Sequence, residues 1–196
     1  DIDVQQTFFS KKTKCCTFKP IVPNYLLGCI LNDTSLPTRL DDYVKKGIKV
    51  TPFGYFPTQD EFRHYASIIP DQFGIDDSAA CELLDNGQCS IWPYRNSMCS
   101  TYFCHYYKGI HGKQFWEDVR DFLQFIEEIL SEYCCYTLGI PVDYIKQHSC
   151  NFFINVQTAL QTHDQATLSE YDIWGKWHNR YGDFFIECQQ ICRALS

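Results

Sequence analysis

The sequence predicts a mainly α-helical domain whose first half is rich in loops. Apolar residues repeat with helical spacing through the second half, whereas prolines and polar turns interrupt the shorter apolar runs of the first half. Hydrophobic residues make up 45% of the 196 residues, which is enough for a packed core. We therefore expect a single domain over residues 1–196, with a loop-rich half at 1–112 and a helical half at 113–196.

The first half is expected to hold short elements. An early loop leads into a short helix or buried strand, and one helical turn is expected at 40–45. The segment 48–57 is extended but holds two prolines, which cannot donate backbone hydrogen bonds, so it is not expected to be a central strand. Thr58 followed three residues later by Glu61 is typical of a capping box, which predicts a helix that ends before Pro70.

The clearest helix is expected at 113–139, where apolar side chains recur every three or four residues. They are Phe115, Val119, Phe122, Ile126, Leu130 and Tyr133. Acidic residues lie opposite, and Glu127 and Glu128 are expected on a solvated surface. Gly139 is expected to end the helix.

Further helices are expected to start near Val142 and to span 150–162 and 181–195. The last of them carries one apolar stripe, formed by Phe184, Phe185, Cys188, Ile191, Cys192 and Leu195. Because free cysteine is among the most buried residue types, the cysteines of this stripe and Cys134 of the long helix are expected in the core.

The charge and hydropathy of the chain argue against two kinds of partner. Lys and Arg number 17 against 24 Asp and Glu, which gives a formal net charge of −7, whereas a phosphate-binding surface needs a surplus of Lys and Arg. No segment approaches the roughly 20 apolar residues that a membrane-spanning helix needs. We therefore expect neither a nucleic-acid partner nor a membrane span.

Twelve cysteines are the unusual feature of the composition. A disulfide framework is one interpretation, but disulfide-dense domains are usually below about 80 residues and lack the core that this chain can build. The cysteines are also unevenly spread, since four lie within 81–104 and none lies within 30–80. Thiolate ligands in a reduced, cytoplasmic protein are the favoured interpretation.

The stretch 81–104, CELLDNGQCSIWPYRNSMCSTYFC, predicts a soft metal centre. A site of this kind needs several thiolates held by short loops that let the sulfurs converge. The dipeptide at 86–87 is Asn-Gly, which favours a turn that folds Cys81 back toward Cys89. Arg95 is expected to offset the charge of the thiolates or to hydrogen-bond one of their sulfurs.

Further sulfurs come from both ends of this stretch. Cys99 and Cys104 form a second short-range pair, and Cys15 and Cys16 offer sulfurs from the start of the chain. The candidate ligands are therefore Cys15, Cys16, Cys81, Cys89, Cys99 and Cys104, with Cys16, Cys81, Cys89 and Cys99 preferred.

The segment 81–102 resembles the motif of the YkgJ-type cysteine-cluster family, whose members are described as zinc- or iron-chelating proteins. That motif runs as a cysteine, a leucine, a turn with glycine, Cys-x-Ile-aromatic, an arginine, and a cysteine followed by an aromatic residue. A related module of flagellin lysine methylases is associated with an iron–sulfur cluster. The family also has an upstream Cys-Cys pair, so the resemblance implies a metal site at Cys15, Cys16, Cys81, Cys89 and Cys99.

An all-thiolate ligand set suits either zinc or an iron–sulfur cluster. The number of candidate cysteines and the nearby aromatic residues favour a buried [4Fe–4S] cluster, with zinc as the alternative. The expected function is redox, electron transfer or metal handling. Two other functions stay open: a protein-modifying enzyme of the lysine-methylase type, and a structural-zinc interaction module whose helical half binds a protein partner.

Overall fold

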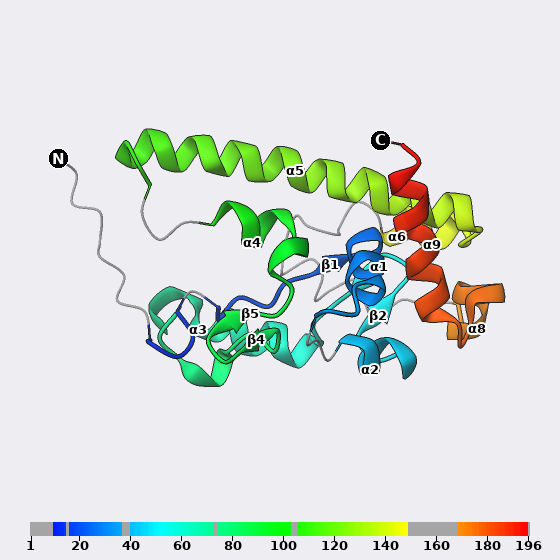
Figure 1. Cartoon of the computed structure of the whole chain (residues 1–196), viewed down its shortest axis with the longest axis horizontal. Helices are drawn as coiled ribbons and strands as arrows, with labels where there is room; N and C mark the ends of the chain where they lie inside the picture. Colours follow the sequence, from blue (N-terminus) through cyan, green and yellow to red (C-terminus); the bar gives the residue numbers. More distant parts are fainter. Residues whose placement is uncertain are drawn as a thin grey trace.

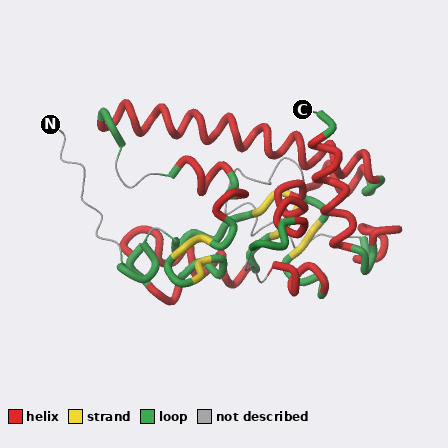
Figure 2. Tube along the Cα trace, in the orientation of Figure 1, coloured by secondary structure: helices red, strands yellow, loops and turns green. Residues whose placement is uncertain are grey.

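The computed structural model describes residues 10–14, 16–36, 40–72, 74–102, 106–148 and 168–195. The fold is mainly helical, as the sequence predicts, and the long helix α5 (Gly109–Leu138) runs along one side of the molecule (Figure 1). Figure 2 shows that the strands are short and that loops join most elements below α5. Within the described ranges, no helix combines the length and the apolar character needed to cross a membrane.

The core forms where α1 (Asn24–Asn32) packs against α9 (Tyr181–Arg193). Leu27 and Ile30 of α1 are buried, and so are Phe184 and Phe185 of α9. α8 (Glu170–Trp174) and a 3-10 helix (Gly175–Trp177) add two tryptophans, whose rings meet the Phe184 ring edge-on at 5.3 and 5.6 Å. This aromatic packing stabilises the end of the molecule that lies opposite the N-terminal loops.

A small antiparallel sheet lies beside α1, with strand order β1–β3–β2. Its strands are β1 (Val22–Pro23), β2 (Val50–Thr51) and β3 (Gly54–Tyr55). The expectation that 48–57 holds no central strand is wrong, because β3 pairs on both edges. The two prolines of this segment lie in the turn before β3 and after its end, where they remove no ladder hydrogen bond.

The helical turn expected at 40–45 is present as α2 (Leu40–Lys45). The next helix, α3 (Gln59–Gln72), starts with the predicted capping box. The Thr58 backbone N–H donates to Glu61 Oε2 at 2.8 Å, and the Glu61 N–H donates to Thr58 Oγ1 at 3.3 Å. The predicted end of this helix is wrong, since α3 continues past Pro70; one backbone hydrogen bond lost near the end of an established helix does not stop it.

Short elements fill the chain between α3 and α5. They are a 3-10 helix at Asp77–Ala79, β4 (Leu84–Asp85), β5 (Gln88–Cys89), a 3-10 helix at Trp92–Tyr94, and α4 (Ser97–Thr101). This is the loop-rich region that holds most of the predicted ligands.

The long helix buries a different face from the one that its apolar residues indicate. Phe115, Phe122 and Tyr133 are exposed, whereas the buried face carries Glu127, Ser131, Cys134, Cys135 and Leu138. The prediction that Glu127 lies on a solvated surface is wrong. Its carboxylate accepts hydrogen bonds from the Ser97 backbone N–H at 2.6 Å and from the Ser97 hydroxyl at 2.7 Å, which join α5 to α4.

Two of the three other expected helices are present, and the third lies outside the described residues. α5 ends at Gly139, which adopts a left-handed conformation with φ of 82°, and α6 (Val142–His148) follows it as predicted. The helix expected at 181–195 is α9, while the one expected at 150–162 lies outside the described residues.

The helical cysteines pack as core residues. Cys134 and Cys188 are fully buried, and Cys192 is half-buried with its Sγ 3.6 Å from Cys134 Sγ. The pKa of the Cys188 thiol is raised, mainly by burial. Cys134 and Cys188 therefore lie in the helical core, as expected, and Cys192 lies at its edge.

Candidate metal centre

The hairpin of β4 and β5 places two of the predicted ligands close together. Asn86 and Gly87 both have positive φ, at 47° and 75°, as in the two-residue turn that Asn-Gly favours. Leu84 pairs with Cys89, and the Leu84 N–H donates to the Cys81 carbonyl at 3.0 Å, so the chain folds back on itself between the two cysteines. The predicted turn is confirmed.

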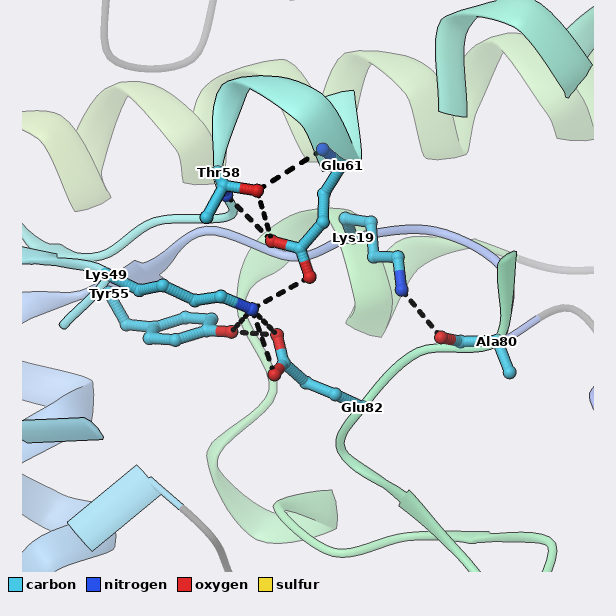
Figure 3. A network of polar contacts seen from close by, with 7 residues as sticks. All are labelled: Lys19, Lys49, Tyr55, Thr58, Glu61, Ala80 and Glu82. Atoms are coloured by element: carbon cyan, nitrogen blue, oxygen red, sulfur yellow. Dashed lines mark hydrogen bonds and ion pairs between the residues drawn. The ribbon is translucent and has the colours of Figure 1, made fainter. Parts of the chain in front are cut away.

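The segment around Cys16 lies against this hairpin. The Cys81 backbone N–H donates to the Cys16 carbonyl at 2.7 Å. Two lysines flank this contact: Lys19 Nζ donates to the Ala80 carbonyl at 2.6 Å (Figure 3), and Lys14 Nζ donates to the Gly87 carbonyl at 3.3 Å. Two predicted ligand stretches that are far apart in the sequence are therefore neighbours in the fold.

Cys99 lies in the middle of the short helix α4, and Arg95 lies close to both Cys99 and Cys89. Asn96 caps α4 by accepting a hydrogen bond from the Cys99 N–H at 3.0 Å, and Arg95 Nη1 donates to the Cys99 carbonyl at 3.2 Å. The Arg95 guanidinium stacks on Trp92, 3.5 Å from the ring centre. Its positive charge also lowers the pKa of Cys89, although burial, which raises that pKa, is the larger effect.

The Arg95 side chain also holds a buried donor that lacks an acceptor. Arg95 Nε is shielded from solvent and makes no hydrogen bond within the part of the chain that the structure describes. Leaving such a donor unpaired costs roughly 1–3 kcal/mol, and more when the group is charged. An acceptor supplied at this position would remove that cost.

Aromatic side chains border the same region. Tyr65 of α3 is buried, and its ring meets Phe18 edge-on with centroids 5.6 Å apart. The pKa of Tyr65 is raised to about 12, mainly by burial and to a lesser extent by the nearby Cys99. Phe18 follows Cys16 by two residues and Tyr65 lies near Cys99, so this aromatic pair lies close to both predicted ligands.

The cysteine thiols of the hairpin are protonated at neutral pH when no metal is bound. Burial raises the pKa of Cys81 to about 11, against a smaller lowering by Lys19. Metal binding would therefore release protons from these thiols.

The structure brings together part of the predicted ligand set. Cys16, Cys81 and Cys89 lie on contacting segments, and Cys99 is linked to them through Arg95. Among the described residues, however, no three Cys, His, Asp or Glu side chains are arranged closely enough to hold a metal ion. Cys15 and Cys104 lie outside those residues, so they stay predictions. The thiol chemistry and the unpaired Arg95 donor fit a soft metal centre, but the sulfurs of the described cysteines do not form a coordination sphere.

The sequence did not predict a polar network that lies beside Cys81 (Figure 3). Lys49 Nζ lies 2.7 Å from Glu61 Oε1 and 2.9 Å from Glu82 Oε1, and the Tyr55 hydroxyl donates to the same Glu82 carboxylate. Glu82 directly follows Cys81, so this network ties the hairpin to α3 and to the sheet. The capping box indicates the position of Glu61, but no local pattern indicates that Lys49 would reach it.

Comparisons with protein-family models, curated proteins and solved structures find no match for this chain.

Proposed function

We propose that the protein binds a soft metal centre, a [4Fe–4S] cluster, through Cys16, Cys81, Cys89 and Cys99, and serves in redox, electron transfer or metal handling. The observation that carries this proposal is the hydrogen bond of 2.7 Å from the Cys81 N–H to the Cys16 carbonyl. It brings a predicted ligand at the start of the chain to the hairpin that holds two more. Cys81 and Cys89 are not joined by a disulfide in this structure, which leaves both thiols available as ligands.

Arg95 gives independent support. Its buried Nε lacks an acceptor among the described residues, beside Cys89 and Cys99. A metal-bound thiolate, or a sulfide of a cluster, would accept this hydrogen bond and be stabilised by the positive charge. Arg95 is therefore proposed as a group that hydrogen-bonds the bound centre rather than as a ligand.

The surroundings of the site suit a buried centre with several thiolates. Lys14 and Lys19 bring two more positive charges to the hairpin, which would offset several thiolates, while Phe18 and Tyr65 would limit the access of water. A [4Fe–4S] cluster, when bound, supplies one-electron transfer, at a potential set by charge, hydrogen bonds to sulfur and solvent exposure. Zinc with the same thiolates would instead be structural.

The proposal is tested by purifying the protein without oxygen and measuring iron, sulfide and zinc together with the absorption spectrum. We expect a brown protein with about four iron and four sulfide per chain. The Cys89→Ser variant is expected to lose most of this iron and the visible absorption. A protein that contains neither iron nor zinc would contradict the proposal.

Cys188→Ser is the matched control, because it makes the same change at a cysteine that is buried in the helical core. It should retain the metal while its stability falls. Equal metal loss in both variants would show that the ligands are assigned to the wrong cysteines.

A structural-zinc interaction module is the second candidate function. The exposed aromatic side chains of α5 favour it, because they offer a surface for a protein partner. A colourless protein with one zinc per chain would support this candidate over the cluster.

A further inference from the structure

The outer face of α5 carries an exposed apolar stripe. We give the name outer face to six side chains that are between 44% and 63% exposed: Phe115, Phe122, Phe125, Ile129, Tyr133 and Tyr136. Four of them, at 115, 122, 129 and 136, are seven residues apart, which is close to two helical turns. The six therefore fall within an arc of about 80°.

This stripe does not belong to the core of the protein. The buried residues of α5, such as Ser131, Cys134 and Leu138, lie almost opposite it on the helix. Among the described residues, α5 thus packs against α1, α4 and α9 with the face opposite the stripe. In Figure 1 the N-terminal end of α5 extends beyond α4, and the helix lies along the edge of the molecule. A helix with a second apolar face of this kind is typical of an interaction surface.

The size of the outer face suits a specific interface. Aromatic side chains bury about 150–250 Å² each, so six residues that are half exposed offer about 600 Å². A standard protein interface buries about 800 Å² on each partner. The outer face with its polar border approaches that area.

The charges beside the stripe indicate the kind of partner. Asp121, Glu128 and Glu132 follow one border of the outer face. Glu128 and Glu132 are four residues apart, and neither forms an ion pair with any residue that the structure describes. The pKa of Glu128 is raised by burial and by the charge of Glu132. Lys or Arg side chains on a partner would relieve this repulsion.

The same charges disfavour a second copy of the chain. In an antiparallel two-fold pair of α5 helices, corresponding borders face each other, so the acidic border of one helix would meet that of the other. A parallel pair would press those carboxylates against apolar side chains. Each chain also has a net charge of −7, which adds long-range repulsion.

We infer that the outer face of α5 is a docking surface for an amphipathic helix of another protein, one whose apolar stripe is bordered by Lys and Arg. The partner would place its apolar residues between Phe115, Phe122 and Ile129, and its cations beside Glu128 and Glu132. In this kind of recognition, the bound helix contacts its partner through apolar side chains spaced by three, four and seven residues.

The test uses two synthetic helical peptides with the same Leu stripe, one bordered by Lys and Arg and the other by Glu. Fluorescence anisotropy with the full chain should show at least tenfold tighter binding of the basic peptide. Equal binding of both peptides, or binding of neither, would overturn the inference.

Two variants locate the binding site on α5. Phe122→Gln combined with Ile129→Gln should weaken binding of the basic peptide at least tenfold, whereas Leu195→Gln, a change at a side chain 58% exposed elsewhere, should leave it unchanged. Glu128→Lys combined with Glu132→Lys should reverse the preference in favour of the acidic peptide. Sedimentation velocity without peptide should give a monomer; a dimer dispersed by the Phe122 and Ile129 changes would assign the surface to a second copy instead.

Discussion

Glu127 is a buried carboxylate of α5, and both of its oxygens accept hydrogen bonds from Ser97 at the start of α4. Burial raises its pKa, and the two hydrogen bonds only partly oppose that effect. The protonated form is therefore better tolerated in the folded protein than in the unfolded chain. It follows that this residue contributes most to stability below the ordinary glutamate pKa of 4.5, and that the contribution is lost as the pH rises through the raised value.

Glu127→Gln tests this sign. Glutamine keeps the shape and an acceptor oxygen but cannot ionise, so the variant should gain stability relative to the native protein as the pH rises from about 4 to 7. Urea unfolding at several pH values measures the difference. A difference that falls with rising pH would show that the Ser97 hydrogen bonds outweigh burial.

Lys49 and Glu61 show what residue-level prediction missed. Lys49 has a positive φ of 58°, and its side chain forms ion pairs with both Glu61 and Glu82. Burial opposes its charge, yet the hydrogen bonds and charges of the two glutamates outweigh that effect and raise its pKa. Neither a positive φ at a lysine nor a partner 33 residues away leaves a local pattern, so the sequence could not predict this network.

Structural features that depend only on neighbouring residues were predicted correctly from the sequence. The capping box at Thr58 and the Asn-Gly turn at 86–87 depend on neighbouring residues, and both are present. The buried face of α5 depends on what packs against it. Its apolar period indicates a helix, but the period cannot show whether an apolar stripe meets the core or solvent.

The contact between α1 and α9 depends on a glycine at an element interface. A Cβ at Gly28 would overlap the Phe185 carbonyl, so Gly28→Ala should push the helices apart and cost about 1–3 kcal/mol. Gly182→Ala in α9 is the control, because the nearest atom to its added Cβ is Val44 Cγ1 at 3.9 Å, an ordinary contact. That change should be neutral or stabilise by about 0.5–1 kcal/mol. Thermal unfolding of both variants measures the two effects, and equal losses would contradict the role of Gly28 in the close approach.

At the scale of the whole molecule, two sets of contacts hold different parts together. Leucine and isoleucine of α1 and the aromatic residues of α8 and α9 form a core of buried side chains. The β4–β5 hairpin reaches this core through the buried side chains of Leu83 and Ile91. Backbone and lysine hydrogen bonds and the Lys49 network join it to the segment around Cys16 and to α3. Cysteine spacing predicted which stretches would meet; it could not place the sulfurs, because their positions depend on long-range packing.

This division predicts which part of the chain responds to metal removal. If the proposed centre joins Cys16 to the hairpin, removing the metal with a chelator under reducing conditions should speed hydrogen exchange at two backbone amides. One is the Cys81 amide, which donates to the Cys16 carbonyl, and the other is the Ser90 amide, which donates to the Leu83 carbonyl. Amides of α9 should keep their protection, since that helix packs in the aromatic core. Exchange measured by mass spectrometry distinguishes the two regions, and the Cys89→Ser variant should reproduce the pattern without a chelator. Equal deprotection of α9 would mean that the metal holds the whole fold, and unchanged exchange at Cys81 would mean that the hairpin does not depend on it.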